Sequence, residues 1–397
     1  MIEGHHIICF GFAEWDNPYR TNQHHIMERL SRNNKVLFIE SQGLRRPTAQ
    51  KKDIIRIVKR LFKWLQGTRV IHENLLVFAP LVIPFHKYAV VRKFNRWFLA
   101  YQLDGIVARY GFSHPLLWSY VPTAVEYLGR WKEKVSVYHC VDELSANPLI
   151  PAKTVQDMEE RFLKKVDVVF TTAPALYESK KKLNANTRYF PNVADFAHFN
   201  KACSPDIPLA KRLRAINSPR LGFIGALSGY KLDFALLASL AQKHPEWALV
   251  LIGPKGEGEK AADVSILEKE KNIHLLGGVP AEQLPSYLKG FDVCLLPNIL
   301  NEYTKNMFPM KFFEYLAAGK PVVSTWLDSL QEFGEYCSLA KNHAEFEASL
   351  VKALAEDTLE KQKQRVELAK RYTWETRLDE FSEVITDTIK RKTSHAS

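Results

Sequence analysis

The strongest local signals lie in Asn306-Met-Phe-Pro-Met-Lys-Phe-Phe-Glu-Tyr-Leu-Ala-Ala-Gly-Lys-Pro-Val-Val-Ser324. Proline is favoured at the first position of a helix, and glycine is favoured just after the last turn. Pro309 and Gly319 therefore predict a short helix from Met310 to Ala318, followed by a buried strand. Open α/β sheets bind ligands at the loops that follow their strands, so we expect the functional residues of this chain in such loops.

Two side chains of the predicted helix suit a nucleotide. Lys311 lies in the first turn, where the helix amides and a lysine together favour a bound phosphate. Glu314 follows three residues later on nearly the same face, where a carboxylate can accept hydrogen bonds from both hydroxyls of a ribose. A solvated ion pair between the two residues is the alternative for this spacing alone.

Outward from this stretch, short β-type runs alternate with helical patterns, which predicts an α/β fold of two Rossmann-like, doubly wound domains. Strands are expected near residues 7–10, 36–39, 75–78, 116–118, 135–139, 166–171, 221–224, 248–252, 273–276, 293–296 and 321–324. The expected organisation is an N-terminal domain over 1–199, a linker over 200–219, a C-terminal domain over 220–375 and a final helix over 376–397 that packs back on the N-terminal domain.

The charge of the chain is uneven. The net charge is +11 over 397 residues. Residues 1–200 contain 29 Lys and Arg against 18 Asp and Glu, whereas residues 201–397 contain 26 of each. An anionic partner, either nucleic acid or an acidic membrane surface, is therefore expected for the first half. The five cysteines contain no CxxC pair, which favours a reducing cytoplasm.

Several segments resemble the group 1 family of GT-B glycosyltransferases, which includes bacterial exopolysaccharide and mannosyl transferases. In that family a Lys and a Glu precede a YLAAGKPVV-type strand, as Lys311 and Glu314 do here. Further similar segments occur in the family's order, at 191–199, 222–233, 251–254, 276–280 and 291–297. The segment at 138–143 is similar to teichuronic-acid-type members of the family.

The resemblance implies a donor site for a nucleoside diphosphate sugar, most simply UDP- or GDP-linked, with no cofactor and no metal. Its residues would be Gly225, Lys231, Val279, Asn306, Met307, Lys311 and Glu314. Gly225 permits close backbone approach, Lys231 reaches the diphosphate, and Val279 lies where such proteins hold the base.

Asn306 departs from the family pattern, because many retaining members have a glutamate at this position. An amide can bind a sugar hydroxyl but cannot supply a carboxylate. Glu302 in the same loop is the alternative carboxylate. Retention or inversion of the anomeric configuration therefore stays open.

The first half contains candidate acceptor residues at the ends of its expected strands. These are Gly11, Trp15, Arg20, Gln23, Trp118 and Tyr120, which suit close backbone approach, sugar stacking and hydroxyl binding. A plain strand-to-helix turn with surface polar residues is the alternative for residues 11–24. Adjacent histidines at 5–6 and 24–25 point apart and lack an acidic cluster, so they do not indicate a metal site.

Asp142 is the first candidate for a general base toward an acceptor hydroxyl, with His139 as its orienter or as an alternative base. The alternative for Asp142 is a helix N-cap before Leu144.

A basic amphipathic helix is predicted over Lys51–Leu65. Its membrane-facing candidates are Lys52, Arg56, Lys59, Arg60, Lys63 and Trp64. Arg92–Leu99 has a similar composition, and such helices lie in anionic headgroup regions. Two surface helices packed on the core with solvated basic faces are the alternative. The longest apolar run, Leu75–Phe85, is too short to span a bilayer.

Together these features predict a metal-independent glycosyltransferase of hexosyltransferase type. It would act in cell-surface polysaccharide biosynthesis, in the cytoplasm and on the inner face of the cell membrane, with a lipid-linked saccharide or polysaccharide as acceptor and without nucleic acid. A nucleotide-sugar epimerase on the same fold is the alternative enzyme, and a non-enzymatic nucleic-acid binder is the alternative outside catalysis.

Overall fold

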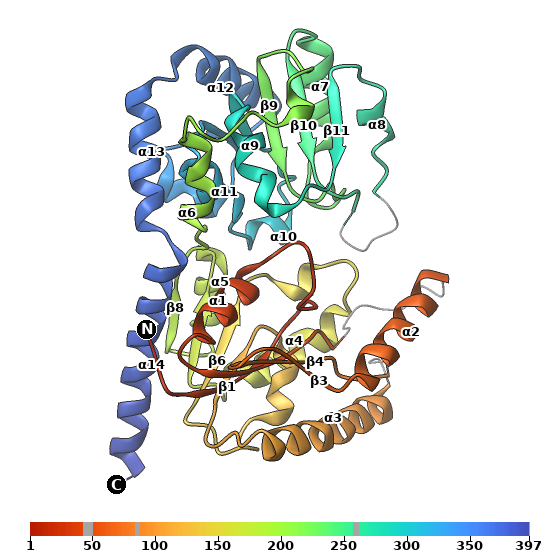
Figure 1. Cartoon of the computed structure of the whole chain (residues 1–397), viewed down its shortest axis with the longest axis vertical. Coiled ribbons are helices and arrows are strands. Elements are labelled where there is room, and N and C mark those ends of the chain that lie inside the picture. The colour runs from red at the N-terminus through yellow and green to blue at the C-terminus, as the bar shows by residue number, and fades with distance from the viewer. Residues whose placement is uncertain (43–50, 84–87, 257–261, 397) are drawn as a thin grey trace. The chain divides into compact units, whose positions relative to one another are not determined.

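The computed structural model describes residues 1–42, 51–83, 88–256 and 262–396; the side chains of 51–57, 395 and 396 lie outside this description. The chain forms two compact units, which are described separately (Figure 1). Unit 1 comprises Met1–Phe190 and Leu378–Ser397, and unit 2 comprises Pro191–Arg377.

Unit 1 is built on an eight-stranded sheet with the order β3-β4-β2-β1-β5-β6-β7-β8, in which only the β3–β4 pair is antiparallel. Its strands are β1 His6–Phe10, β2 Lys35–Ile39, β3 Thr68–His72, β4 Leu75–Phe78, β5 Leu116–Ser119, β6 Val135–Cys140, β7 Val168–Thr171 and β8 Thr187–Tyr189. Its helices are α1 Asn22–Leu30, α2 Lys51–Leu65, α3 Ala89–Arg109, η1 Pro122–Tyr127, η2 Leu144–Ala146, α4 Ala152–Leu163 and α5 Pro174–Lys180.

Apolar side chains on both faces of this sheet explain why it is buried. Ile8 and Phe10 of β1 pack in one core with Leu99 of α3 and Phe162 of α4. On the other face, Phe170 of β7 stacks on Phe381 of the last helix, α14 Trp374–Ala396, with ring centroids 4.4 Å apart. Residue Phe10 pairs with Ile39 and Ser119, so the carboxyl ends of β2, β1 and β5 lie at one edge.

Unit 2 contains a six-stranded parallel sheet with the order β11-β10-β9-β12-β13-β14. Its strands are β9 Arg220–Ile224, β10 Ala248–Ile252, β11 Ile273–Gly277, β12 Val293–Leu296, β13 Val322–Thr325 and β14 Ser338–Ala340. Its helices are α6 Phe196–Phe199, η3 Asn200–Cys203, η4 Lys211–Leu213, α7 Phe234–Lys243, α8 Ser265–Glu268, η5 Ala281–Gln283, α9 Leu284–Lys289, α10 Glu302–Lys305, α11 Lys311–Ala317, η6 Asp328–Phe333, α12 His343–Glu356 and α13 Leu359–Arg371.

All eleven predicted strands are present, and the fold of two Rossmann-like α/β domains is confirmed. The sequence patterns missed β3, β8 and β14. Each of the three lies at the edge of its sheet, is five residues long or shorter, and has no continuous apolar run.

The segment 200–219 differs from the linker expected there. Its prolines and polar residues suggested an open connection, but Ala202, Ala210, Leu213 and Ile216 are buried in a core that also contains Leu288 of α9. Pro191 already begins unit 2, and α14 passes from unit 2 into unit 1 at Arg377 and Leu378.

Candidate functional site

Helix α11 places the candidate phosphate and ribose side chains in unit 2. It begins at Lys311, one residue later than predicted, and has Met310 at its N-cap. Phe312, Phe313 and Tyr315 are fully buried, so almost the whole helix surface packs in the core. The Tyr315 hydroxyl accepts a hydrogen bond from the Ile224 amide, 2.9 Å away, which ties α11 to the carboxyl end of β9.

Lys311 and Glu314 form the ion pair that their spacing allows. The Lys311 Nζ donates to Glu314 Oε2 over 2.7 Å. The pair is not a solvated one, however, because the Glu314 side chain is only 6% exposed while that of Lys311 is 30% exposed. A buried carboxylate is costly unless it is paired, and here its partner reaches the surface. The arrangement presents one cation at the surface and a carboxylate just beneath it.

The loops after β9 and β12 are joined to each other around Lys231. The Lys231 ammonium lies 5.0 Å from the ring centroid of Tyr303 in α10 and 5.5 Å from that of Tyr230. The main-chain carbonyl of Lys231 accepts a hydrogen bond from the Ile299 amide over 2.9 Å. Cation–π contact holds the ammonium at the loop surface instead of letting it extend into solvent.

Glycines set the backbone geometry at the neighbouring strand ends. The Gly225 amide donates to the Ile252 carbonyl over 2.8 Å. A Cβ atom on Gly253, whose φ is +148°, would lie 1.9 Å from the Gly225 carbonyl oxygen. Only glycine fits at position 253, because both the backbone conformation and the close approach exclude a side chain.

A cavity of about 550 Å³ opens beside these glycines. Its lining comes from the segments that follow β9 and β10, from the end of α8 and from β11, namely Leu227, Gly253, Pro254, Lys255, Glu268, Ile273, Leu275, Leu276 and Gly277. The predicted base-binding residue, Val279, is not among them and packs partly buried against the core. Most residues that line the cavity belong to no motif that the sequence would reveal. Only the glycines at the ends of β10 and β11 indicated a binding site at this edge of the sheet.

The remaining donor candidates lie in and after α10. The Asn306 side-chain amide donates to the Glu302 carbonyl over 2.7 Å, so it helps to close the last turn of α10. Met307 is partly buried, and its carbonyl accepts a hydrogen bond from the Ser329 hydroxyl over 2.8 Å. Glu302 is exposed in the first turn of the same helix. Asn306 and Glu302 are therefore neighbours on one short helix.

In unit 1, the loop after β1 packs tightly against α1. A Cβ atom on Gly11 would lie 2.4 Å from the Phe38 ring and 2.8 Å from Gln23 Oε1, so glycine is needed for packing there. The Gln23 side chain is fully buried, and its Oε1 accepts a hydrogen bond from the Phe12 amide over 2.9 Å. These two residues fix the loop, and neither offers a sugar-binding surface.

Trp15 and Arg20 lie further along the same loop. Trp15 is 5% exposed, with its ring centroid 5.0 Å from that of Phe38. The Arg20 guanidinium covers the Trp15 ring at 5.0 Å and pairs with Glu28. Arg20, itself a predicted acceptor-binding residue, thus covers one side of the Trp15 ring.

Trp118, Tyr120 and His139 are buried in an aromatic cluster, which corrects the site roles predicted for them. Their exposures are 0%, 2% and 2%. Tyr120 stacks on His139 at 4.9 Å, and Phe381 of α14 lies edge-on to both Trp118 and His139. Because α14 covers this face, the three side chains serve packing, and His139 is not accessible as an orienter or a base.

Asp142 lies two residues beyond β6 and is partly exposed. It is not a helix N-cap: η2 has Glu143 at that position, without a side-chain capping bond. Glu143 instead accepts a hydrogen bond over 2.7 Å from Lys180, which also binds the buried Glu159 at 2.7 Å. Burial opposes ionisation of Glu143, but the Lys180 charge and the hydrogen bonds from Lys180 and Ser145 together outweigh it and lower the Glu143 pKa. The strand end that carries Asp142 is thereby held in place.

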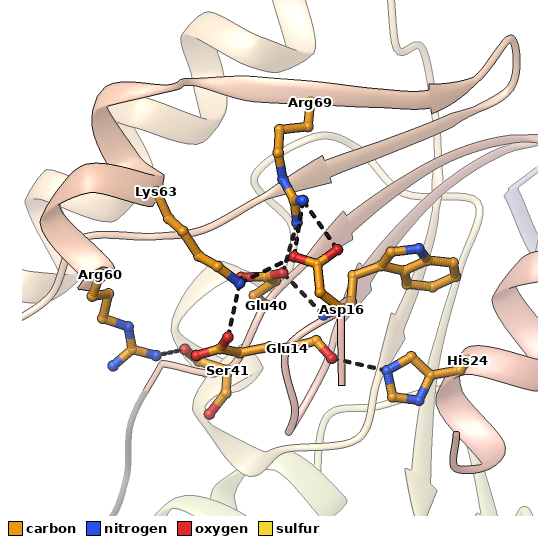
Figure 2. A network of polar contacts seen from close by, with 9 residues as sticks. Glu14, Asp16, His24, Glu40, Ser41, Arg60, Lys63 and Arg69 are labelled. Carbon is orange, nitrogen blue, oxygen red and sulfur yellow. Dashed lines mark hydrogen bonds and ion pairs between the residues drawn. The ribbon is translucent and has the colours of Figure 1, made fainter. Parts of the chain in front are cut away.

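Helix α2 is present as predicted, but its basic side chains do not all face solvent. Figure 2 shows Lys63 directed toward carboxylates of the loop after β1, with Nζ 2.8 Å from Glu14 Oε2 and 3.2 Å from Asp16 Oδ2. Arg69 of β3 binds Asp16 at 2.9 Å and Glu40 at 3.0 Å. Burial lowers the pKa of Lys63, but its bonds to these carboxylates outweigh that effect and raise it overall.

Two more α2 side chains are also engaged with the protein. Arg60 donates to the Ser41 carbonyl (Figure 2). The Trp64 indole N–H donates to Gln102 Oε1 of α3 over 2.7 Å. Lys59 is exposed. Lys52 and Arg56 lie in α2, but their side chains are outside the described residues. Lys63, Arg60 and Trp64 are thus held in contacts with the protein itself and are only partly exposed, and their lipid-facing role stays a prediction.

Among the described residues, no group of three or more His, Cys, Asp or Glu side chains is placed to hold a metal ion. None of the described helices is both long enough and apolar enough to cross a membrane.

The comparisons with known proteins agree with this architecture. Over its whole length the chain has the GT-B fold. It matches a sucrose-phosphate synthase from Thermosynechococcus elongatus with a TM-score of 0.70, at 16% identity over 99% of this chain and 100% of that one. It also matches Anabaena HepE in complex with UDP and glucose, with a TM-score of 0.66 and 16% identity over 96% and 99% of the two chains.

The family resemblance is likewise confirmed. Residues 218–357 match the family described as glycosyl transferases group 1. A curated relative from Bacillus subtilis (strain 168), "Putative teichuronic acid biosynthesis glycosyltransferase TuaH", is 30% identical over 181 residues. That match covers 45% of this chain and 45% of the relative, which is less than half the length of either protein.

Proposed function

We propose that the protein is a glycosyltransferase that takes a sugar from a nucleoside diphosphate donor bound to unit 2 and transfers it to an acceptor bound to unit 1. The observation that carries the proposal is the Lys311–Glu314 pair on α11. It lies within the family-matched residues 218–357 and combines a surface cation with a buried carboxylate. A cation can pair with the diphosphate, and a carboxylate can accept hydrogen bonds from the ribose hydroxyls.

Lys231 and Lys311 would balance the negative charge that develops on the leaving diphosphate. Preorganised cations are an effective way to stabilise such charge, because they need not reorganise during the reaction. No metal ion is needed in this proposal. The 550 Å³ cavity beside Gly253 and Gly277 is large enough for a nucleotide base and is bordered by apolar side chains that a base can contact.

Asp142 would accept the proton of the attacking acceptor hydroxyl. It lies two residues beyond β6, is partly exposed, and directly precedes Glu143, which forms an ion pair with Lys180. His139 has no part in this proposal because α14 covers it. Position 306 carries no carboxylate, so the carboxylate role of a family glutamate would fall to Glu302 if it is needed.

A lipid-linked saccharide for cell-surface polysaccharide is the acceptor we propose, taken at the inner membrane face. The support is a surface of exposed apolar side chains on two neighbouring helices, which we term the α2–α3 surface. Its members are Val58, Leu61, Phe62 and Leu65 of α2 and Val90, Phe94, Trp97 and Tyr101 of α3, each at least 40% exposed. Exposed apolar surfaces of this kind mark membrane or protein contacts.

The experiment that tests the proposed function has two stages. First, the thermal unfolding of the purified chain is measured with UDP, GDP, ADP and TDP, each alone; one of them should raise the midpoint, since a ligand that binds only the native state stabilises it. Second, the matching nucleotide sugar is incubated with and without a membrane lipid extract. Sugar transfer to lipid supports the proposal, whereas a changed sugar on the nucleotide without any acceptor would make the protein an epimerase.

A further inference from the structure

A second cavity, of about 310 Å³, lies in unit 1. Its walls come from segments that follow β2, β4 and β5, from the N-terminal half of α3, and from α4 along its length. None of the residues that the sequence singled out for substrate binding lines it. The lining residues are Gln42, Val82, Ala89, Arg92, Lys93, Asn95, Arg96, Thr123, Glu126, Tyr127, Pro151, Thr154, Val155, Met158 and Arg161.

Two buried hydrogen-bond donors in the wall lack a partner in the part of the chain that the structure describes. Gln42 and Thr123 are each 7% exposed. Within the described residues, Gln42 Nε2 and Thr123 Oγ1 make no hydrogen bond. Leaving a buried polar group unsatisfied costs free energy, so such groups are usually paired in the functional state. Both groups can donate to an oxygen atom of a ligand in the cavity.

The cavity wall is also strongly cationic. It contains four basic side chains and one carboxylate, which gives a net charge of +3. Glu126 binds Arg96 at 3.0 Å and Arg161 at 2.9 Å. Burial opposes its ionisation, but the two guanidinium groups outweigh this and lower the Glu126 pKa. Glu126 therefore holds both guanidinium groups at the cavity while about half of each side chain faces solvent.

The wall also has an apolar part, which continues onto the α2–α3 surface. Val82, Val155 and Met158 line the cavity beside the charged groups. Helix α3 presents Arg92, Lys93 and Arg96 to the cavity, and one step around the same helix it exposes Val90, Phe94 and Trp97. A ligand that fits both features has an anionic oxygen-rich group and a hydrocarbon chain.

We propose that this cavity binds the phosphate group of a lipid phosphate, with the hydrocarbon chain lying on the α2–α3 surface. Resting on the proposed function, this makes the cavity the site that holds the carrier end of the lipid-linked acceptor. Guanidinium groups bind phosphate through paired, charge-assisted hydrogen bonds, and Gln42 and Thr123 supply two further donors.

The test measures binding of farnesyl phosphate, presented in neutral detergent micelles, to the full chain by calorimetry. Arg161→Gln should weaken binding by roughly tenfold or more, because a charged hydrogen bond to the phosphate is lost. Thr123→Val should also weaken binding, because it removes a neutral hydrogen-bond donor. Thr123→Val keeps the side-chain shape, and in Arg161→Gln the Glu126 carboxylate keeps Arg96 as a partner. The matched control is Arg130→Gln, another paired guanidinium of unit 1 that is 42% exposed and does not line the cavity.

Three further probes separate the possible sources of the anion. Farnesol, which lacks the phosphate, and inorganic phosphate, which lacks the chain, should each bind at least about tenfold more weakly than farnesyl phosphate. Vesicles of phosphatidylglycerol should bind wild type and cavity variants equally. The proposal is overturned if the cavity variants bind farnesyl phosphate as tightly as wild type does. It is also overturned if farnesol or inorganic phosphate binds as tightly as farnesyl phosphate, or if the cavity variants lose binding to the vesicles.

Nucleoside diphosphate binding is measured on the same variants. It should be unchanged, because the donor site is in unit 2. If wild type binds farnesyl phosphate through Arg161 and Thr123 but binds no nucleoside diphosphate, the cavity assignment stands and the proposed function fails. If wild type binds the nucleotide but not farnesyl phosphate, the cavity assignment fails and the proposed function stands.

Discussion

The Nζ atom of Lys63 on α2 lies 2.8 Å from the Oε2 atom of Glu14 in the loop after β1. This contact turns one basic side chain of the amphipathic helix inward, where Asp16 and the buried Glu40 also lie within 4 Å of it. Helix α2 is thereby attached to the loop that was expected to bind the acceptor. Apolar side chains of α2 are instead turned outward, with Phe62 and Leu65 each more than 60% exposed.

Replacing Lys63 by alanine should therefore destabilise unit 1. The change leaves the buried Glu40 with Arg69 as its remaining basic partner, so we expect a loss of roughly 1–2 kcal/mol in the free energy of unfolding. Urea denaturation followed by tryptophan fluorescence measures it. Lys59→Ala is the control, because Lys59 is exposed on the same helix, and it should change stability by less than about 0.5 kcal/mol. Equal effects of the two changes would mean that the network does not hold α2.

The α2–α3 surface predicts where membrane binding is lost. Changing Phe62 and Trp97 together to serine should weaken binding to phosphatidylglycerol vesicles by at least about tenfold, because two large side chains no longer enter the lipid. Sedimentation with vesicles gives the partition coefficient. Leu359→Ser is the control, since Leu359 is 76% exposed but lies in unit 2. Unchanged partitioning of the double variant would remove this surface from the proposed function.

His24 makes the stability of unit 1 sensitive to acid. Burial lowers its pKa from 6.5 to about 4. Its Nδ1 accepts a hydrogen bond from the Thr21 amide over 3.1 Å, and Nε2 lies 3.0 Å from the Glu14 carbonyl, which fits the neutral ring. The unfolded chain binds the proton more readily than the folded one, so stability falls as the pH drops from 6.5 toward 4.

The loss from this group is at most about 3 kcal/mol, since one pKa unit corresponds to about 1.4 kcal/mol. A His24→Gln variant should lose less stability than wild type between pH 7 and pH 4.5, although it starts from a lower value. Urea denaturation at each pH measures the difference. His72→Gln, at an exposed position, should follow wild type. If His24→Gln and wild type show the same slope, His24 is not responsible.

Strong local patterns made the central fold predictable. The inner strands are apolar runs bounded by turn residues, and the helix around Lys311 has clear start and stop signals. The short edge strands β3, β8 and β14 lack such runs. The Lys311–Glu314 contact was foreseeable because both residues lie on one helix and their spacing alone brings them together.

Contacts between distant segments could not be predicted in the same way. Trp118 and His139 occupy strand positions that could face a ligand, and only the packing of Phe381, far along the chain, shows that they are covered. Lys63 meets carboxylates of another segment for the same reason. Gln42 and Thr123 belong to no motif, and only their burial without partners distinguishes them from ordinary polar residues.

The donor site can be tested at α11 without measuring turnover. Lys311→Met should weaken nucleoside diphosphate binding by roughly tenfold or more, because it removes the surface cation while keeping the length of the chain. The loss of its partner also leaves Glu314 buried and unpaired, so the thermal midpoint must be recorded in the absence of ligand. Lys305→Met, an exposed position on α10, is the control. Normal nucleotide affinity in a folded Lys311→Met protein would remove Lys311 from the donor site.

Asp142→Asn separates catalysis from donor binding. If Asp142 accepts the proton of the acceptor hydroxyl, the amide cannot replace it, and turnover should fall by roughly 100- to 10,000-fold while nucleoside diphosphate affinity stays unchanged. Asp157→Asn is the matched control, an exposed carboxylate on α4 of the same unit, and it should keep full activity. The nearby Glu143–Lys180 pair is intact in both variants, so a fall confined to Asp142→Asn reports on the carboxylate itself. Turnover of Asp142→Asn at the wild-type rate would show that another group accepts the proton.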